Sequence, residues 1–352
     1  MSVPTRLCIA LFASALVSWG AAGQQANPST LRSRQTAPPP RTISLDVVVT
    51  HKSGDAVSGL EEKDFTILDN KTPQTITSFH AYEGSKEPIE VILLIDSINT
   101  SFQIVAQERD GIEKFLRSNE GRLAHPLTLA VLTNDGVQMQ GAYTLDGNIL
   151  ATSLDKYTIG LRTIGPSTGA EGAAERLQDS LKALRMLASY EMNRPGRKLI
   201  LWVSPGWPLL SGPRVDLTYK QQGGIFNEIT WLSTQLRQEE TTIYSLNPMG
   251  VAENPAETFY YQQFLNGVSR PEEDAMGNLA LQVIATETGG LVLDSSDVAA
   301  LLKQCMGDAG AYYRISFEPP ASEHRDVYHR LQIKLTEPGL TARTSTGYYG
   351  EP

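Results

Sequence analysis

Hydrophobic residues along the middle of this chain fall into two alternating patterns. Short, fully apolar runs alternate with segments in which apolar residues recur every three or four positions. The first pattern is typical of strands buried on both faces of a sheet, and the second of amphipathic helices. The predicted strands are residues 91–95, 127–132, 199–203, 242–246 and 290–293, with an alternating edge strand at 137–143. The predicted helices are residues 104–116, 173–190, 226–236, 279–288 and 298–306. This alternation predicts an α/β fold with a doubly wound, mostly parallel sheet.

Both flanks of this α/β segment have the pattern of β-strands without intervening helices. The predicted flanking strands are residues 43–49, 65–68 and 75–79 before it, and 312–317, 327–335 and 341–348 after it. Because the two ends of a domain often lie close together, we expect these strands to form one small β-sandwich built from both chain ends. The predicted units are therefore N-terminal strands at 41–85, an inserted α/β domain at 86–307, and C-terminal strands at 308–352 that pack with 41–85.

The first residues have the pattern of a targeting segment. Arg6 precedes a short apolar stretch at residues 7–19, and the small residues Ala21 and Gly23 suit cleavage before Gln24. Residues 24–40 are rich in Gln, Ser, Thr, Ala and Pro, as in a disordered linker. The pattern predicts a signal peptide at 1–23 and a secreted or periplasmic protein without membrane insertion of the mature chain.

Cleavage would leave a single cysteine, Cys305, so an internal disulfide is not expected. Cys305 lies in the amphipathic segment 298–306, which favours a buried thiol over a nucleophile or an intermolecular bridge. A large hydrophobic core is therefore expected to stabilise the mature chain.

Composition and charge exclude several classes of function. The 352 residues carry a formal net charge of −9, which disfavours binding to nucleic acid or to an anionic membrane. The chain contains no Gly-x-Ser-x-Gly elbow, no phosphate-binding loop with its lysine, and no His-Glu-x-x-His. We therefore expect a protein that is not an enzyme. A hydrolase is the less favoured alternative, and it would need a second acid beside Asp96 and a deep pocket.

The candidate chemistry lies where the apolar run 91–95 ends at Asp96. Ligands bind outside the carboxyl ends of strands in open α/β sheets, and Asp96 is followed there by hydroxyl residues such as Ser97 and Thr100. A carboxylate with hydroxyl oxygens suits a hard cation such as Mg²⁺ or Mn²⁺. The alternative is that Asp96 only caps the next helix or orders the turn.

The order of strands and helices over residues 86–307, together with Asp96 at a strand end, resembles a von Willebrand factor type A (VWFA) domain. The flanking segments, which begin near Val47 and Tyr312, resemble those of secreted VWFA-related proteins of acidobacteria. The resemblance implies a domain that recognises other proteins, in the metal-dependent members through a bound divalent cation whose coordination shell the partner completes.

The metal-dependent members of the family carry Asp-x-Ser-x-Ser/Thr, a Thr from a second loop and often an Asp from a third. The resemblance assigns Asp96, Thr100 and Thr168 as the expected ligands, with Ser167 as an alternative to Thr168. Ile98 and Pro205 depart from the pattern, because neither supplies a side-chain oxygen. The expectation is a weak site for Mg²⁺ or Mn²⁺, or no cofactor at all.

The favoured function is non-enzymatic protein binding, in adhesion or recognition, at the strand-end face. The expected partner-binding residues are Asp96, Ser97, Asn99, Thr100, Ser204 and Trp207. Trp207 is either an exposed contact residue or a core residue folded back on the sheet. The insertion 247–276, with its aromatic run 259–264, is either a partner-contacting loop or a solvated flap. The alternative function is a structural or assembly component of the cell envelope in which the β flanks make the contacts.

Overall fold

The computed structural model describes residues 42–83, 89–156, 169–191, 194–208, 217–250, 259–320 and 324–350. The predicted signal peptide, the predicted linker and Thr168 lie outside these ranges. None of the helices in the described part combines the length and apolar character needed to cross a bilayer.

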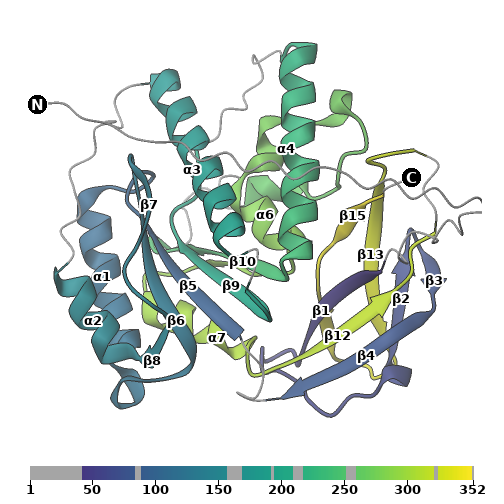
Figure 1. Ribbon diagram of the computed structural model, residues 1–352, viewed down its shortest axis with the longest axis horizontal. Helices are drawn as coiled ribbons and strands as arrows, with labels where there is room; N and C mark the ends of the chain where they lie inside the picture. Colours follow the sequence, from purple (N-terminus) through teal and green to yellow (C-terminus); the bar gives the residue numbers. More distant parts are fainter. Residues whose placement is uncertain are drawn as a thin grey trace, which may run out of the picture. The chain divides into compact units, whose positions relative to one another are not determined.

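A seven-stranded sheet forms the centre of the α/β half, in the order β11-β10-β9-β5-β6-β7, with β8 also paired to β6 (Figure 1). Neighbouring strands from β11 to β6 are parallel, whereas β7 and β8 pair antiparallel with β6. The strands are β5 (Ile89–Asp96), β6 (Arg122–Thr133), β7 (Gly136–Met139), β8 (Thr144–Asp146), β9 (Arg197–Val203), β10 (Thr241–Asn247) and β11 (Val292–Asp294).

Helices cover both faces of this sheet, which is why its central strands are apolar throughout. One face packs against α1 (Phe102–Leu116), α2 (Gly147–Lys156) and α7 (Val298–Gly307). The other packs against α3 (Gly169–Glu191), α4 (Tyr219–Gln238) and α6 (Leu281–Glu287). In β5, Val91, Leu93 and Ile95 face the first layer, and Ile92 and Leu94 the second, as the two-residue period of a strand requires.

The flanking strands form two four-stranded antiparallel sheets, in the orders β14-β1-β12-β4 and β15-β13-β2-β3. Their shared core includes Val47, Ile67, Tyr313 and Phe317. The N-terminal members are β1 (Ile43–Thr50), β2 (Phe65–Asp69), β3 (Thr72–Gln74) and β4 (Ile76–Glu83). The C-terminal members are β12 (Ala311–Phe317), β13 (Tyr328–Leu335), β14 (Thr341–Arg343) and β15 (Gly347–Tyr349). β12 lies between β1 and β4, so both chain ends build the sandwich (Figure 1). The predicted fold class is confirmed.

The predicted strand at 341–348 is wrong in one respect, because two separate strands occupy this range. β14 pairs with β1 in one sheet, whereas β15 pairs with β13 in the other. The sequence analysis also missed β8 and α2. Helix α2 is short, and the apolar side chains that its described part buries are Leu150, Ala151 and Leu154, so its apolar pattern is weak.

The insertion after β10 is anchored on both halves of the molecule in its described part. Asn278 Nδ2 donates a hydrogen bond to the Phe264 carbonyl (3.1 Å), within the α/β half. The backbone N–H of Tyr328, in the sandwich, donates to Ser269 Oγ (3.3 Å). Residues 259–276 are therefore attached to both halves, and the choice between a partner-contacting loop and a solvated flap stays a prediction; residues 251–258 lie outside the described ranges.

A buried group of ion pairs joins the sandwich to the start of the central strands. Arg314 of β12 donates to both carboxylate oxygens of Asp46 in β1 (2.8 and 3.1 Å) and pairs with Glu240, just before β10 (2.6 Å). Arg197, the first residue of β9, lies 3.7 Å from Asp46 and donates to the Asp308 carbonyl (2.9 Å). These contacts place the sandwich at the strand-start edge of the central sheet.

Removing Arg314 should therefore weaken the whole fold. We expect Arg314→Ala to lose about 2–4 kcal/mol of unfolding free energy, because it removes the guanidinium that pairs with both Asp46 and Glu240, two neighbouring, partly buried carboxylates. Urea denaturation followed by circular dichroism measures this loss. Arg122→Ala is the control, since Arg122 is exposed and its pair with Glu120 spans 3.9 Å. Equal, small losses in both variants would contradict the role assigned to Arg314.

Candidate functional site at the strand ends

The strand order places a crevice position between β5 and β9. From β5 the chain continues to β6 and β7 on one side of the sheet, and later to β9, β10 and β11 on the other side. The strand order therefore reverses between β5 and β9. Ligands of doubly wound sheets bind at this switch point, outside the carboxyl ends of the strands. Asp96 ends β5, and Ser204 follows β9. The topology therefore selects the same position as the sequence pattern.

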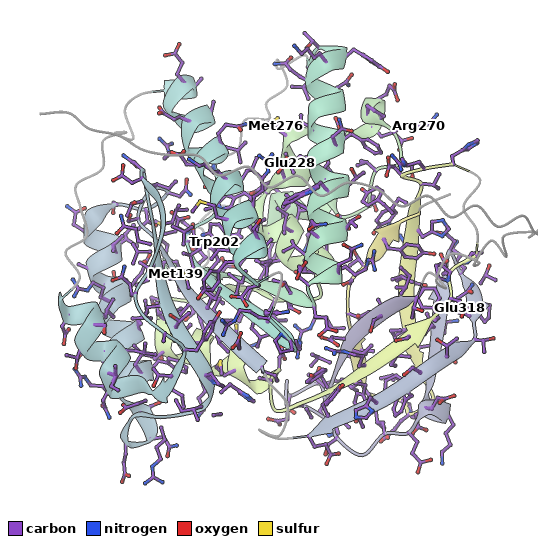
Figure 2. All side chains as sticks on the ribbon, in the orientation of Figure 1. Met139, Trp202, Glu228, Arg270, Met276 and Glu318 are labelled. Carbon is purple, nitrogen blue, oxygen red and sulfur yellow. The ribbon has the colours of Figure 1, made fainter. Side chains whose placement is uncertain are left out.

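The carboxylate of Asp96 is fully buried and receives hydrogen bonds from within the protein. Its Oδ1 accepts from the backbone N–H groups of Ile98 (3.1 Å) and Asn99 (3.0 Å). Its Oδ2 accepts from Asn99 Nδ2 (2.8 Å) and from the indole N–H of Trp202 (3.0 Å). Trp202 lies on the side of the sheet covered by α3 (Figure 2). Asp96 therefore orders the turn, which is one of the two alternatives predicted from the sequence.

The other residues of this loop turn toward the protein. Ser97 Oγ donates to the Leu132 carbonyl of the neighbouring strand (2.6 Å). Ile98 is 1% exposed and packs in the core with α3. Thr100 is buried, whereas Asn99 is partly exposed. Helix α1 is capped by Ser101, whose Oγ accepts from the N–H of Ile104 (3.4 Å), so Asp96 is not its cap.

Trp207 is a core residue, and the expectation of an exposed contact there is wrong. It is 4% exposed and lies 5.2 Å from Trp202 between ring centroids, at an interplanar angle of 66°. Ser204 is fully buried, and its Oγ accepts from the N–H of Gly206 (3.1 Å). The physical reason is that the apolar α3 side of the sheet continues past β9, and the two indoles fill the crevice position. These side chains offer a partner almost no surface.

The described residues do not fit a divalent cation at this loop. The side-chain N–H groups of Asn99 and Trp202 donate to Asp96 Oδ2, an oxygen that a cation would need. The Ser97 hydroxyl donates to the Leu132 carbonyl. Ile98 has no ligand atom, and Pro205 stands where the family often has Asp. No group of three or more His, Cys, Asp or Glu side chains with metal-binding geometry occurs within the described ranges.

A second acid, Glu108 of α1, lies close enough to Asp96 for electrostatic coupling. Glu108 is fully buried, and neither of its carboxyl oxygens has a hydrogen-bond partner among the described residues. Burial, and secondarily the charge of Asp96, raise the pKa of Glu108 to about 9. The acid pair required by the hydrolase alternative is thus present, but solvent reaches neither carboxyl group, so the pair is sealed from a substrate.

The described part of the strand-end face also carries exposed apolar residues that the sequence analysis did not select. Tyr219 opens α4 after β9, Met249 follows β10, and Phe259 begins the described insertion; they are 74%, 59% and 52% exposed. Tyr260, next to Phe259, donates to Gln282 Oε1 (3.2 Å), and Gln282 lies against Gly206 after β9. We call Tyr219, Met249 and Phe259 the rim residues. Only Phe259 had a sequence signal, the aromatic run 259–264.

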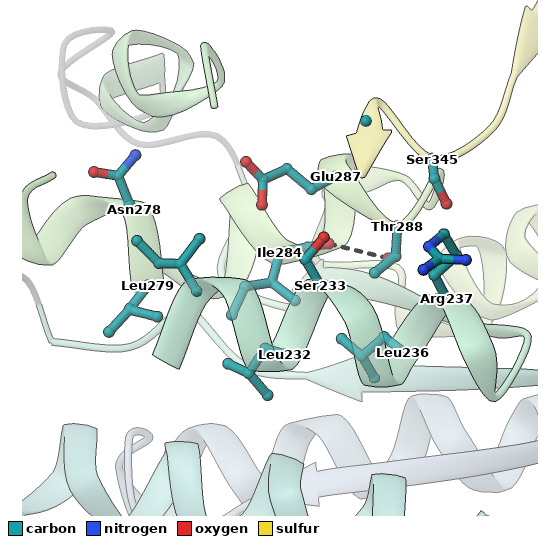
Figure 3. A pocket seen from close by; sticks show the side chains of 12 residues that line it. Leu232, Ser233, Leu236, Arg237, Asn278, Leu279, Ile284, Glu287, Thr288 and Ser345 are labelled. Atoms are coloured by element: carbon teal, nitrogen blue, oxygen red, sulfur yellow. Dashed lines mark hydrogen bonds between the residues drawn. The ribbon is translucent and has the colours of Figure 1, made fainter. Parts of the chain in front are cut away.

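A separate cavity of ≈ 20 Å³ lies between α4, α6 and the segment leading into β15 (Figure 3). Glu287, Asn278 and Ser233 line it beside leucine and isoleucine side chains. Burial raises the pKa of Glu287 to about 8. The space suits about one water molecule, so this cavity is too small for a substrate.

Comparisons with solved structures return proteins of the same general architecture at low scores. The conserved hypothetical protein BatB from Bacteroides thetaiotaomicron is 14% identical, with a TM-score of 0.32, covering 63% of this chain and 98% of that chain. The SpRpn10 VWA domain is 11% identical, with a TM-score of 0.29, covering 62% and 95%. Manganese-loaded TRAP protein from Plasmodium vivax is 11% identical, with a TM-score of 0.34, covering 78% and 99%.

No protein-family model and no curated protein matches the chain. TM-scores this low add no weight, so the VWFA-like fold rests on the strand order, the parallel pairing and the two helix layers. The narrower resemblance to acidobacterial secreted proteins stays a prediction.

The raised pKa of Glu108 predicts a stability that falls with pH. Its pKa rises from 4.5 to about 9 on folding, so the folded state binds the proton more tightly, and stability declines as pH increases between these values. Glu108→Gln should flatten this decline by up to about 1.4 kcal/mol per pH unit, because the amide does not ionise. Urea denaturation between pH 5 and pH 9 measures the slopes, with Glu120→Gln as control, because the Glu120 side chain is 86% exposed. Parallel slopes for wild type and Glu108→Gln would refute the assignment.

Burial of Trp207 predicts a large stability loss on truncation. Trp207→Ala should lose about 3–5 kcal/mol of unfolding free energy, as expected for a core aromatic side chain. Trp231→Ala is the matched control, because Trp231 is 38% exposed on α4. Chemical denaturation of both variants measures the difference, and a loss in Trp207→Ala no greater than in Trp231→Ala would mean that Trp207 is not core.

Proposed function

We propose that this protein is a non-enzymatic recognition protein that binds another protein at the strand-end face, after secretion or export to the periplasm. The observation that supports this most is the exposure of the rim residues Tyr219, Met249 and Phe259 on segments that follow the neighbouring strands β9 and β10. Large exposed apolar side chains are costly in water, and aromatic residues and Met are enriched where binding energy concentrates.

The structure around the central sheet favours its strand-end face over its strand-start edge as the place where a partner binds. The strand-start edge is covered by the sandwich through Asp46, Arg197 and Arg314. Asn247 at the end of β10 donates to Asp294 Oδ1 at the end of β11 (2.8 Å), and its own Oδ1 accepts from the Met249 N–H (3.0 Å). Met249 is thus held in place on a bonded loop, which lowers the entropy lost on binding.

An enzymatic role has less support. The acid pair of Asp96 and Glu108 is inaccessible, and the cavity beside Glu287 has room for about one water molecule. The expected contact residues Asp96, Ser97, Thr100, Ser204 and Trp207 act in this proposal by shaping the strand ends, while Asn99 and the rim residues supply the surface. The envelope-component alternative would instead place the contacts on the β-sandwich.

Truncating rim residues should weaken partner binding without unfolding the protein. Met249→Ala and Phe259→Ala should each weaken binding at least about tenfold, the loss of a contact worth about 1.4 kcal/mol. Ile149→Ala is the matched control: Ile149 is 56% exposed on α2, whose start packs against the end of α1 and the beginning of β6. Stability should change by less than about 0.5 kcal/mol in all three variants.

The measurement is affinity capture from the extracellular fraction of the source organism, followed by titration of the captured protein against each variant. A partner retained by Ile149→Ala and lost by the rim variants supports the proposal. A partner that binds all variants equally, and loses affinity only when exposed residues of β4 are changed, would favour the envelope component instead.

A further inference from the structure

We propose that the charge of Asp96 is stabilised by hydrogen-bond donors of the protein itself, with the Trp202 indole and the Asn99 amide taking the place that a divalent cation has in the metal-dependent type A pattern. The strand end is then complete without a cation. This inference goes beyond the proposed function, because it concerns what holds the strand end together and not which partner binds at the rim.

The hydrogen bonds of Asp96 use its full acceptor capacity. An ionised carboxylate has about four acceptor positions, and four N–H groups at 2.8–3.1 Å occupy them. Hydrogen bonds to a charged acceptor are about twice as strong as those between neutral groups. A cation that approached Asp96 Oδ2 would meet the hydrogens of Asn99 and Trp202, so it would have to displace both.

The two donors are themselves held in position. Asn99 Nδ2 also donates to Ser180 Oγ (2.9 Å), and that hydroxyl donates to the Arg176 carbonyl (2.8 Å), so the orientation of the amide is determined. Trp202 is fully buried and packs edge-on against Trp207. Turning the indole away from Asp96 would open space in the core on the α3 side of the sheet.

The departures from the family pattern agree with this interpretation. Ile98, at the position of a ligand serine, packs in the core, and the Ser97 hydroxyl donates to Leu132. Pro205 removes the third-loop carboxylate. A lost cation without other changes would leave Asp96 as an unpaired buried charge, which is strongly destabilising. The Trp202 indole and the Asn99 amide avoid this destabilisation, because both donate hydrogen bonds to the Asp96 carboxylate.

The first test compares wild type with Asp96→Asn in EDTA and in 1 mM MnCl₂. If the donors are internal, the variant places an amide NH₂ against N–H groups and should melt at least about 5 °C lower even in EDTA. Mn²⁺ should shift the wild-type melting temperature by less than about 1 °C, against several degrees for a bound ligand in large excess. Equal melting temperatures in EDTA that diverge only with Mn²⁺ would overturn the proposal.

The second test isolates the indole N–H. Trp202→Phe and Trp207→Phe remove similar volume from the same cluster, but only Trp202 donates to Asp96. Trp202→Phe should melt lower than Trp207→Phe, because only Trp202→Phe removes a hydrogen bond to the buried Asp96 carboxylate. Indistinguishable variants would refute the role of the indole.

A third measurement begins with the wild-type protein alone. Titration of wild type with Mn²⁺, followed by the electron paramagnetic resonance signal of free Mn²⁺, should show no stoichiometric binding. One bound Mn²⁺ per chain that is lost in Asp96→Asn would overturn the proposal. The rim variants leave Asp96 and its donors intact, so failure of this inference and failure of the partner proposal give different results.

Discussion

The buried carboxylate of Asp96 is the interaction on which the rest of the strand-end face depends. A full charge at the end of a central, apolar strand is tolerated only where donors surround it, and here they come from its own loop and from Trp202 of the neighbouring strand. The loop closes tightly around Asp96 for this reason, and the adjoining indole of Trp207 packs over the crevice position. The same low-dielectric surroundings keep Glu108 protonated.

The junction between the two halves determines which edge of the central sheet is free. Arg314, Asp46 and Glu240 form a partly buried ion-pair group beside the start of β10, and Arg197 extends it to the start of β9. Breaking such a group by removing one partner is costly, so the sandwich is firmly attached at the strand-start edge. The sandwich does not cover the opposite edge, where the proposed contact residues Tyr219, Met249 and Phe259 are exposed.

These two features together describe a strand end whose interior is closed and whose rim is apolar. In the metal-dependent type A pattern the partner completes the coordination shell of a cation. Here Asp96 has its donors, so the proposed recognition would depend on apolar contact area around the switch point. Under this proposal the surface would bind through its aromatic and Met side chains, and its affinity would depend little on divalent cations.

The apolar runs and their spacing were sufficient to predict the fold class, the order of its strands and helices, and Asp96 at a strand end, because burial on both faces requires uninterrupted apolar strands. They did not reveal α2, whose buried apolar side chains are Leu150, Ala151 and Leu154, nor the division of residues 341–348 between two sheets. The burial and the hydrogen bonding of the site residues were decided by the tertiary structure. Whether Trp207 is core or surface, and whether Asp96 meets a cation or an indole, depends on Trp202, a residue 106 positions from Asp96 that sheet pairing brings to 3.0 Å. Local sequence does not encode that contact, because it arises only when β5 and β9 become neighbours.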